Sequence, residues 1–249
     1  MIKLPTDHNI PAAKIAAMYI GAVIGAGFAS GQEIMQFFVM HGEKAVPEVL
    51  MVTGLFCYLG TSILLVSIKF GATDYSVLVN GLLGTKVSII LDVLAMLMLL
   101  GGLSIMLSGS AAVFDEYFGL TPWLGIGLVL AVNCLVLYGG LQGVLYINVL
   151  LVPVKVTIII AISLLVIWMN EPCGSAGVSC RPTAGQVPDH WALAGIVYVS
   201  YNMILVTAVL STLGQSINKK DAVLGGMLGG LGLGLTAWSL VAAGLSRYP

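Results

Sequence analysis

The sequence predicts an all-α, polytopic membrane protein, and three observations carry that prediction. Of the 249 residues, 59% are hydrophobic and only 8% are charged, whereas a soluble domain carries about 25% charged residues. The apolar residues gather into seven segments, each near the roughly 20 residues that a helix needs to cross a bilayer. Runs such as VSIILDVLAMLMLLGGLSIML do not alternate polar and apolar residues, which favours helices over barrel strands.

The expected spans follow one another along a single transmembrane domain that covers residues 1–249. The lipid bilayer is therefore an expected partner. The net charge of -1 gives no basic face for nucleic acid, so nucleic-acid binding is set aside. Apolar spans continue after the first one, unlike the polar mature sequence behind a signal peptide, so we expect the first span to remain. We place the spans at about 12–40, 47–69, 87–113, 121–138, 143–169, 191–213 and 222–246.

The loop charges predict a cytoplasmic N-terminus. With that orientation six lysines face the cytoplasm, against three basic residues outside, as the positive-inside rule requires. The cytoplasmic set is Lys3, Lys14, Lys69, Lys86, Lys219 and Lys220; the outer set is Lys44, Arg181 and Arg247.

The first span contains a pattern that predicts a broken helix. Its middle reads GAGFASGQE, and glycine costs about 1 kcal/mol relative to alanine in a helix. Ser30-Gly31-Gln32-Glu33 fits a capping box, with Ser30 as N-cap and Glu33 as the third helical residue. We therefore expect two half-helices, about 12–24 and 31–40, with free backbone groups between them that survive only in a protein-lined or wet cavity.

The break predicts a substrate site at residues 25–31, with the positive end of the second half-helix suited to an anionic group. The expected contacts are Gly25, Ala26, Gly27, Ser30 and Gly31. An alternative is an intact packing helix, because Gly21/Gly25 and Gly27/Gly31 are also GxxxG pairs. Glu33 is read either as a cap or as a ligand and proton-handling group.

The sixth span offers a counterpart. Tyr198, Ser200, Tyr201 and Asn202 interrupt its apolar run near mid-depth, where they could wall and hydrogen-bond a substrate. Tyrosines also serve as ordinary packing and interfacial residues. The position of these residues favours the substrate site, because the irregular first and sixth spans are five spans apart, as an inverted repeat would place them.

Lys155 lies near the middle of the fifth span. An ammonium there costs about 2.5–3.5 kcal/mol on insertion scales, so we expect it to face a cavity or a partner. Pro153 leaves the carbonyl of Val149 without a helical donor nearby. We predict an ion-coupling role for Lys155, with a structural ion pair as the alternative.

Four cysteines divide between spans and one loop. Cys57 and Cys134 fall within spans, whereas Cys173 and Cys180 share the loop of residues 170–190, predicted to be extracytoplasmic. An oxidising compartment and the short separation favour a disulfide there, and two free thiols are the alternative.

Enzymatic activity is not expected. His8, His41 and His190 all fall in tails or loops, so no base lies at the depth of Ser30. HExxH, phosphate-loop and Cys/His metal patterns are absent from the sequence, and no metal or organic cofactor is expected. The last span reads GGMLGGLGLGLTAW, whose GxxxG spacings predict close helix packing.

The blocks GAGFASGQEIMQFF, LLGGLSIMLSGSAAVFDEYFG, INVLLVPVK and VYVSYNMILVTAVLSTLG resemble the YkvI-like bacterial membrane proteins. That family resembles a branch of the amino acid/polyamine/organocation superfamily, whose fold is the LeuT-type five-plus-five inverted repeat. The resemblance implies a first repeat at about 12–169, a partial second repeat at about 191–246, and a location in the bacterial cytoplasmic (inner) membrane. Because the chain holds seven spans where that fold has ten core helices, it is expected to be C-terminally truncated.

The resemblance implies a secondary transporter whose small-molecule substrate lies between unwound parts of spans one and six. Lys155 is similar to a lysine that replaces sodium in some proton-coupled relatives, so H+ or Na+ coupling is expected. The resulting hypothesis is an ion-coupled permease for an amino acid or related organic ion that works by alternating access. The alternative is a non-transporting sensor or assembly subunit that keeps the fold. A passive channel is a weaker third reading, because no ring of like charges or carbonyl filter is evident.

Overall fold

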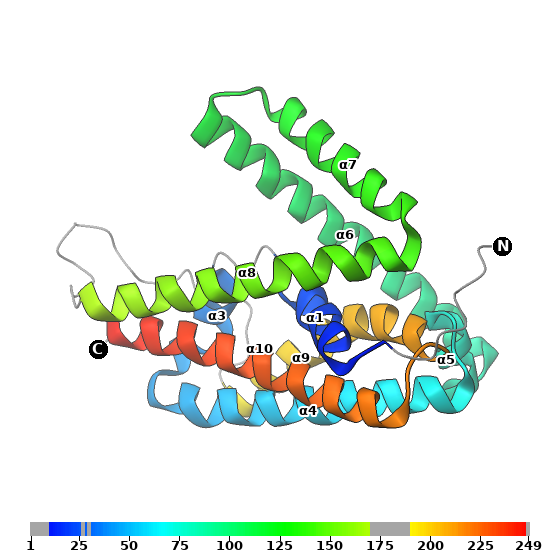
Figure 1. The fold of residues 1–249 in the computed structure, drawn as a ribbon. Helices are drawn as coiled ribbons and strands as arrows, with labels where there is room; N and C mark the ends of the chain where they lie inside the picture. Colours follow the sequence, from blue (N-terminus) through cyan, green and yellow to red (C-terminus); the bar gives the residue numbers. More distant parts are fainter. Residues whose placement is uncertain (1–9, 26–27, 29–30, 170–189, 248–249) are drawn as a thin grey trace.

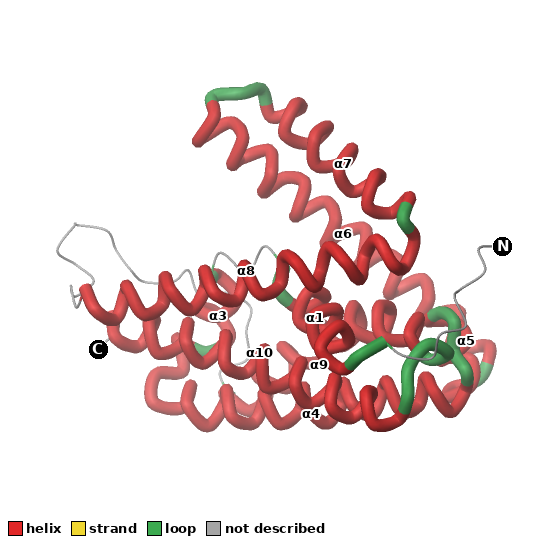
Figure 2. Tube along the Cα trace, viewed as in Figure 1, coloured by secondary structure: helices red, strands yellow, loops and turns green. Residues whose placement is uncertain are grey.

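The computed structural model describes residues 10–25, 28, 31–169 and 190–247, and within these ranges it is helical without strands (Figures 1 and 2). The chain folds through α1 (Ala12–Val23), α3 (Gln32–Phe37), the 3-10 helix η1 (Val39–Lys44) and α4 (Ala45–Phe70). The short α5 (Tyr75–Leu83) and the long α6 (Thr85–Phe118) follow. The remaining elements are α7 (Pro122–Tyr138), α8 (Gly140–Met169), α9 (Trp191–Leu210), η2 (Ser211–Leu213) and α10 (Lys219–Arg247).

The apolar helices fit the expected polytopic membrane protein. In the described residues, five segments are long and apolar enough to cross a bilayer: Val39–Phe70, Thr85–Phe118, Gly140–Met169, Trp191–Leu213 and Lys219–Ser246. Two apolar helices, α1 and α7, are shorter. Each of the seven predicted spans therefore has a helical counterpart, with α1 and α3 together forming the first.

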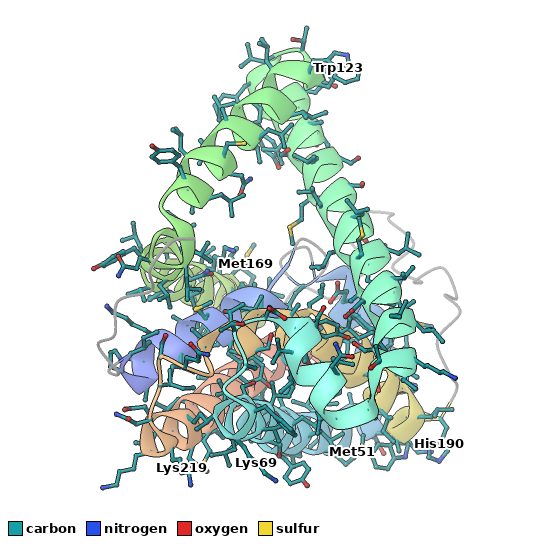
Figure 3. All side chains as sticks on the ribbon, turned by 90° about the vertical axis from the view of Figure 1, so that its right-hand side faces the viewer. Met51, Lys69, Trp123, Met169, His190 and Lys219 are labelled. Carbon is teal, nitrogen blue, oxygen red and sulfur yellow. The ribbon has the colours of Figure 1, made fainter. Side chains whose placement is uncertain are left out.

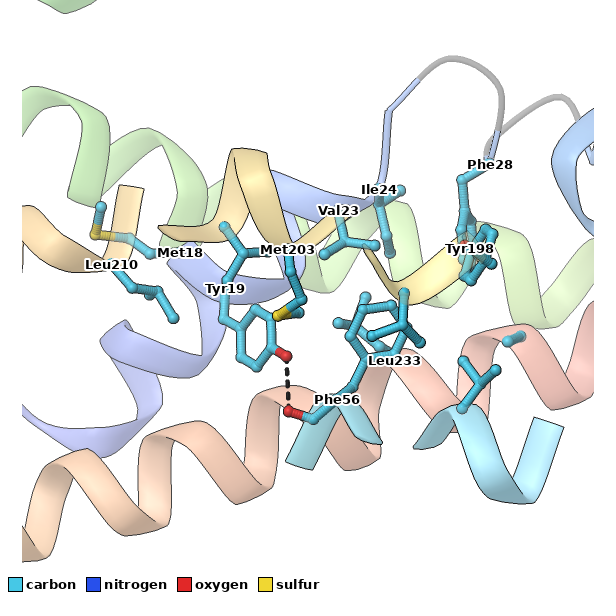
Figure 4. Close-up of a cluster of buried hydrophobic side chains, with 14 of the residues drawn as sticks. Met18, Tyr19, Val23, Ile24, Phe28, Phe56, Tyr198, Met203, Leu210 and Leu233 are labelled. Carbon is cyan, nitrogen blue, oxygen red and sulfur yellow. Dashed lines mark hydrogen bonds between the residues drawn. The ribbon is translucent and has the colours of Figure 1, made fainter. Parts of the chain in front are cut away.

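The core lies where α1, α4, α9 and α10 pack together, and α8 crosses α1 and α10 (Figure 1). Tyr19 of α1 is fully buried, and its hydroxyl donates to the carbonyl of Phe56 on α4 at 2.8 Å (Figure 4). Because this bond satisfies the polar tip of a large buried ring, the aromatic body can fill the core without an unpaired hydroxyl. By contrast, α6 and α7 form a hairpin that projects away from the bundle, with Trp123 near its tip (Figure 3).

The glycines of α10 pack as predicted. A Cβ on Gly226 would overlap Thr61 of α4, and one on Gly230 would lie 2.6 Å from the backbone nitrogen of Cys57. On the adjacent face, a Cβ on Gly229 would enter the ring of Tyr19. The absence of side chains therefore lets α10 touch both α1 and α4, which is the role that small residues have in membrane helix packing.

The first span is interrupted, as the sequence predicts. Helix α1 ends at Val23 and α3 begins at Gln32, with Gly31 at φ +73° immediately before it. Glycine suits this left-handed conformation because it has no Cβ to clash with the backbone. Gly21 packs closely against the side chain of Asn148 on α8, as the packing alternative expects for that glycine.

Two details of the predicted breaks are wrong. The N-cap of α3 is Gly31, without a side-chain cap bond, so Glu33 is the second helical residue and does not complete the predicted capping box. The predicted interruption of the sixth span does not occur either, since α9 is continuous from Trp191 to Leu210. Two of its polar side chains form hydrogen bonds within the same helix: Ser200 donates to the carbonyl of Ile196, and Asn202 donates to the carbonyl of Tyr198. These residues are therefore accommodated without a break in the helix.

Helix α5 was not expected from the sequence. It begins after Asp74, whose carboxylate accepts a hydrogen bond from the backbone nitrogen of Val77 at 2.9 Å. An aspartate at this position is a typical N-cap. The cap signal was present in the sequence, although the segment is too short to read as a span.

Candidate functional site

A cavity of about 350 Å³ lies at the break in the first span, between the end of α1, Glu33 of α3, α6 and α9. Its wall is mostly aliphatic, and Glu33 is the charged side chain among its described lining residues. A mainly apolar hollow with a few convergent polar groups is the usual form of a small-molecule site. The lining consists of Ala22, Val23, Gly25, Glu33, Met98, Gly101, Gly102, Ile105, Met106, Tyr201, Asn202 and Leu205.

Glu33 and Tyr201 join two of the walls. The hydroxyl of Tyr201 donates to Oε2 of Glu33 at 2.9 Å, which connects α3 to α9. Both residues are part-buried and both line the cavity. The carboxylate keeps further acceptor capacity, because an ionised Glu offers two oxygens and Tyr201 donates to one of them.

The neighbouring residues of α9 divide between the core and the cavity. Tyr198 is 1% exposed and packs its ring against Phe37, Phe38 and Phe56. Its hydroxyl is buried without a hydrogen-bond partner among the described residues. Asn202 donates from Nδ2 to the carbonyl of Tyr198 at 2.9 Å and lines the cavity. The helix therefore presents Tyr201 and Asn202 to the hollow and keeps Tyr198 in an aromatic cluster beside it.

A second cavity of about 350 Å³ contains Lys155. It lies between the end of α1, α6 and α8, and its lining residues are Ile24, Gly25, Met106, Lys155, Ile158, Ile159 and Ile162. Gly25 and Met106 line both cavities. The two hollows are therefore neighbours, one with a carboxylate and the other with an ammonium, on either side of the residues that follow α1.

The structure brings together four residues of the predicted site, with Lys155 next to them. Gly25, Glu33, Tyr201 and Asn202 line the first cavity. Gly31 precedes α3, Tyr198 lies in the adjacent core, and Ser200 is exposed, so these three are not among its lining residues. Ala26, Gly27 and Ser30, and the cysteines Cys173 and Cys180, lie outside the described residues.

Sequence reasoning missed the contribution of α6. Met98, Gly101, Gly102, Ile105 and Met106 form one wall of the first cavity. The adjacent glycines 101 and 102 were a visible signal, since they leave room beside a helix. The sequence does not indicate, however, whether that room faces a cavity, another helix or lipid.

A buried acid was also missed. Glu48 of α4 is 0% exposed and bonds to His41 of η1 at 2.9 Å. The sequence placed His41 in a loop and gave Glu48 no role. Within the described ranges, no group of three or more His, Cys, Asp or Glu side chains is arranged to hold a metal ion.

The chain is similar to two bacterial proteins, one of which is named as a membrane protein. It is 31% identical to the uncharacterized membrane protein YkvI of Bacillus subtilis (strain 168) over 225 residues, which are 87% of this chain and 62% of YkvI. It is 28% identical to the uncharacterized protein YyaD of the same organism over 211 residues, or 80% of this chain and 56% of YyaD.

The chain thus spans less than two thirds of the length of both relatives. No protein-family profile matches the chain. No solved structure matches it either. The similarity to YkvI confirms the resemblance expected from the sequence blocks.

Proposed function

Because the chain is a homologue of the membrane protein YkvI, we propose that it provides the substrate-binding part of a secondary transporter for an amino acid or a related organic ion. The observation that carries the proposal is the cavity of about 350 Å³ at the break in the first span. A helix break exposes backbone groups that are tolerated at membrane depth only where protein or water satisfies them. The cavity beside this break is where a polar solute would meet those groups.

The lining chemistry suits a solute with an ammonium group and a small apolar body. Glu33 would accept from the ammonium, while Tyr201 holds the carboxylate in place through its hydrogen bond. The aliphatic residues of α1, α6 and α9 would contact the carbon skeleton. This assignment differs from the anionic group expected at the start of α3, because a carboxylate now occupies that end of the helix.

Ion coupling is the second part of the proposal. Lys155 lies in the neighbouring cavity and shares Gly25 and Met106 with the first. Its side chain places an ionisable group next to the chain segment that would contact the solute. Alternating access would then consist of movement of α1 and α3 relative to α6 and α8 around the two cavities.

The test is binding and uptake by the full chain reconstituted in lipid vesicles, with a panel of radiolabelled amino acids and organic amines as probes. Saturable uptake that increases with an imposed pH or sodium gradient is the expected result. Saturable binding without uptake would favour the sensor or assembly-subunit alternative. Absence of both binding and uptake for the whole panel would overturn the proposal.

We further propose that the N-terminus is cytoplasmic in the bacterial cytoplasmic membrane, on the basis of the loop charges. Fusions of alkaline phosphatase, which is active only outside the cytoplasm, report the side of each loop. We expect activity for a fusion after Glu43 and none for a fusion after Thr73. The opposite pattern would reverse the orientation.

A further inference from the structure

A buried acid–base pair lies at the end of the bundle where α4 begins, and neither the cavities nor the proposed function use it. Nδ1 of His41 and Oε2 of Glu48 are 2.9 Å apart. The Glu48 side chain is 0% exposed and that of His41 is 10% exposed. Oε1 of Glu48 is buried without a hydrogen-bond partner in the described part of the chain. An acid in this position is therefore held by a single neighbour.

The pair lies at the contact between α4 and α9. A Cβ built on Gly195 of α9 would lie 2.8 Å from Cε of Met51 and 3.3 Å from Cγ of Glu48. Ala194 next to it is fully buried. Helix α9 thus contacts Glu48, so separation of the two helices there would open a route for water to the carboxylate.

In the described part of the chain, no other charged group forms an ion pair with Glu48. Among the described residues, His41 is the basic group that forms an ion pair with Glu48. Glu43 and Lys44 of η1 and His190 before α9 are exposed. Further titratable groups on the packed elements are Glu33 on α3, Tyr75 on α5, Tyr198 and Tyr201 on α9, Lys219, Lys220 and Asp221 on α10, and Cys57, Tyr58 and Lys69 on α4 itself.

One proton on the pair makes it neutral overall, either as imidazolium with carboxylate or as imidazole with carboxylic acid. Loss of that proton leaves a buried carboxylate opposite a neutral ring, and an uncompensated buried charge is strongly unfavourable. The packed arrangement therefore needs the proton, whereas a separated, hydrated arrangement does not. Separation above the ordinary titration range of histidine would release one proton to water.

We propose that Glu48 and His41 form a proton-binding site whose occupancy keeps α9 packed on α4. Above about pH 6.5 the packed form binds one more proton than the separated form, so rising pH favours separation in that range. When one proton is released, the ratio of separated to packed molecules rises by at most about tenfold per pH unit. The increase begins near pH 6.5, where a hydrated histidine loses its proton.

The experiment measures access to the α4–α9 contact through a reporter thiol. Ala194→Cys is introduced into a chain in which the native cysteines are replaced by serine, and its rate of reaction with a water-soluble maleimide is followed from pH 5 to 9 in detergent. Lys44→Cys, at an exposed position of η1, gives the intrinsic pH dependence of thiol reactivity. The quantity compared is the ratio of the two rates.

The ratio is expected to rise with pH above about 6.5 in the parent. Glu48→Gln removes the acid but keeps a hydrogen-bonding side chain of the same shape, so its ratio should stay constant above that pH. His41→Gln leaves the proton on the carboxyl alone, so the rise should begin about two pH units lower, near the titration of a hydrated glutamate, and the ratio should already be increasing at pH 5.

A ratio that does not change with pH in the parent would overturn the proposal, as would an equal rise in Glu48→Gln. If Glu48→Gln fails to fold, the displacement of the onset in His41→Gln decides the question, and an unmoved onset counts against the site. The test uses no solute, so it can succeed or fail independently of the transport proposal.

Discussion

Glu33 and Tyr201 are 168 residues apart in the sequence and are joined by a hydrogen bond of 2.9 Å from the tyrosine hydroxyl to the carboxylate. The bond crosses from α3, behind the break in the first span, to α9 in the sixth. It brings the two irregular segments of the sequence to one cavity, although only the first of them is irregular in backbone.

The carboxylate of Glu33 should determine which solutes bind. Glu33→Gln keeps the size of the side chain and removes its charge, so the affinity for an ammonium ligand should fall by roughly tenfold or more, as for loss of a charge-assisted bond worth about 1.5–3 kcal/mol. Radioligand binding measures the change. Ser200→Ala is the matched control, because Ser200 is exposed and its hydroxyl donates to the carbonyl of Ile196 in its own helix. Equal affinities in the parent and Glu33→Gln would exclude Glu33 as a ligand.

The hydroxyl of Tyr201 should stabilise the contact between α3 and α9. Tyr201→Phe keeps the ring and removes the donor, and the expected loss of stability is about 1 kcal/mol. Thermal unfolding in detergent measures it. Tyr58→Phe is the control, because Tyr58 is 70% exposed. Equal unfolding temperatures for both variants would show that the bond contributes nothing to stability.

The glycines of α10 should tolerate no side chain. Gly230→Leu would drive atoms into the backbone of Cys57 on α4, and overpacking of this kind costs about 1–3 kcal/mol or more. We expect a large fall in the unfolding temperature. Gly109→Leu on α6 is the control, since a Cβ there meets nothing within 4 Å. Similar losses in both variants would contradict close packing as the cause.

Gly31, the left-handed residue before α3, and Gly54 inside α4 should respond to alanine with opposite changes in stability. Gly31→Ala should destabilise the protein by about 1 kcal/mol, because alanine is strained at φ +73°. Gly54→Ala lies inside α4 with no atom within 4 Å of its Cβ, and it should be neutral or stabilising by up to about 1 kcal/mol. Unfolding temperatures compare the two, and stabilisation by Gly31→Ala would refute the conformation of the break.

Lys155 should affect coupling more than binding. In vesicles, Lys155→Ala should abolish the increase in uptake that a pH gradient drives, because the ionisable side chain in the cavity beside Gly25 is gone. Lys86→Ala, at an exposed position near the start of α6, is the control. A parent-like gradient effect in Lys155→Ala would assign coupling to another group.

Prediction from the sequence succeeded where a residue pattern has one dominant structural effect. Long apolar runs must be helices in a membrane because backbone groups need partners there, so the apolar helices could be predicted, five of them long enough in the described residues to cross a bilayer. The break in the first span was readable for a similar reason, since clustered glycines weaken a helix wherever they occur. The predicted interruption of the sixth span was wrong because Ser200 and Asn202 can form hydrogen bonds within their own helix. The sequence composition does not distinguish that arrangement from an unwound segment.

The sequence by itself determined that the chain is a helical membrane protein, that its first span is interrupted between α1 and α3, and that α10 packs through glycine. Each of these follows from local chemistry. Only the tertiary structure decided that Glu33 meets Tyr201, that α6 supplies a wall of their cavity, that Lys155 lies in a neighbouring hollow, and that Glu48 is buried against His41. These relationships depend on how distant helices rotate and cross, and a helix presents its residues to lipid, core or cavity according to its neighbours and not its own composition.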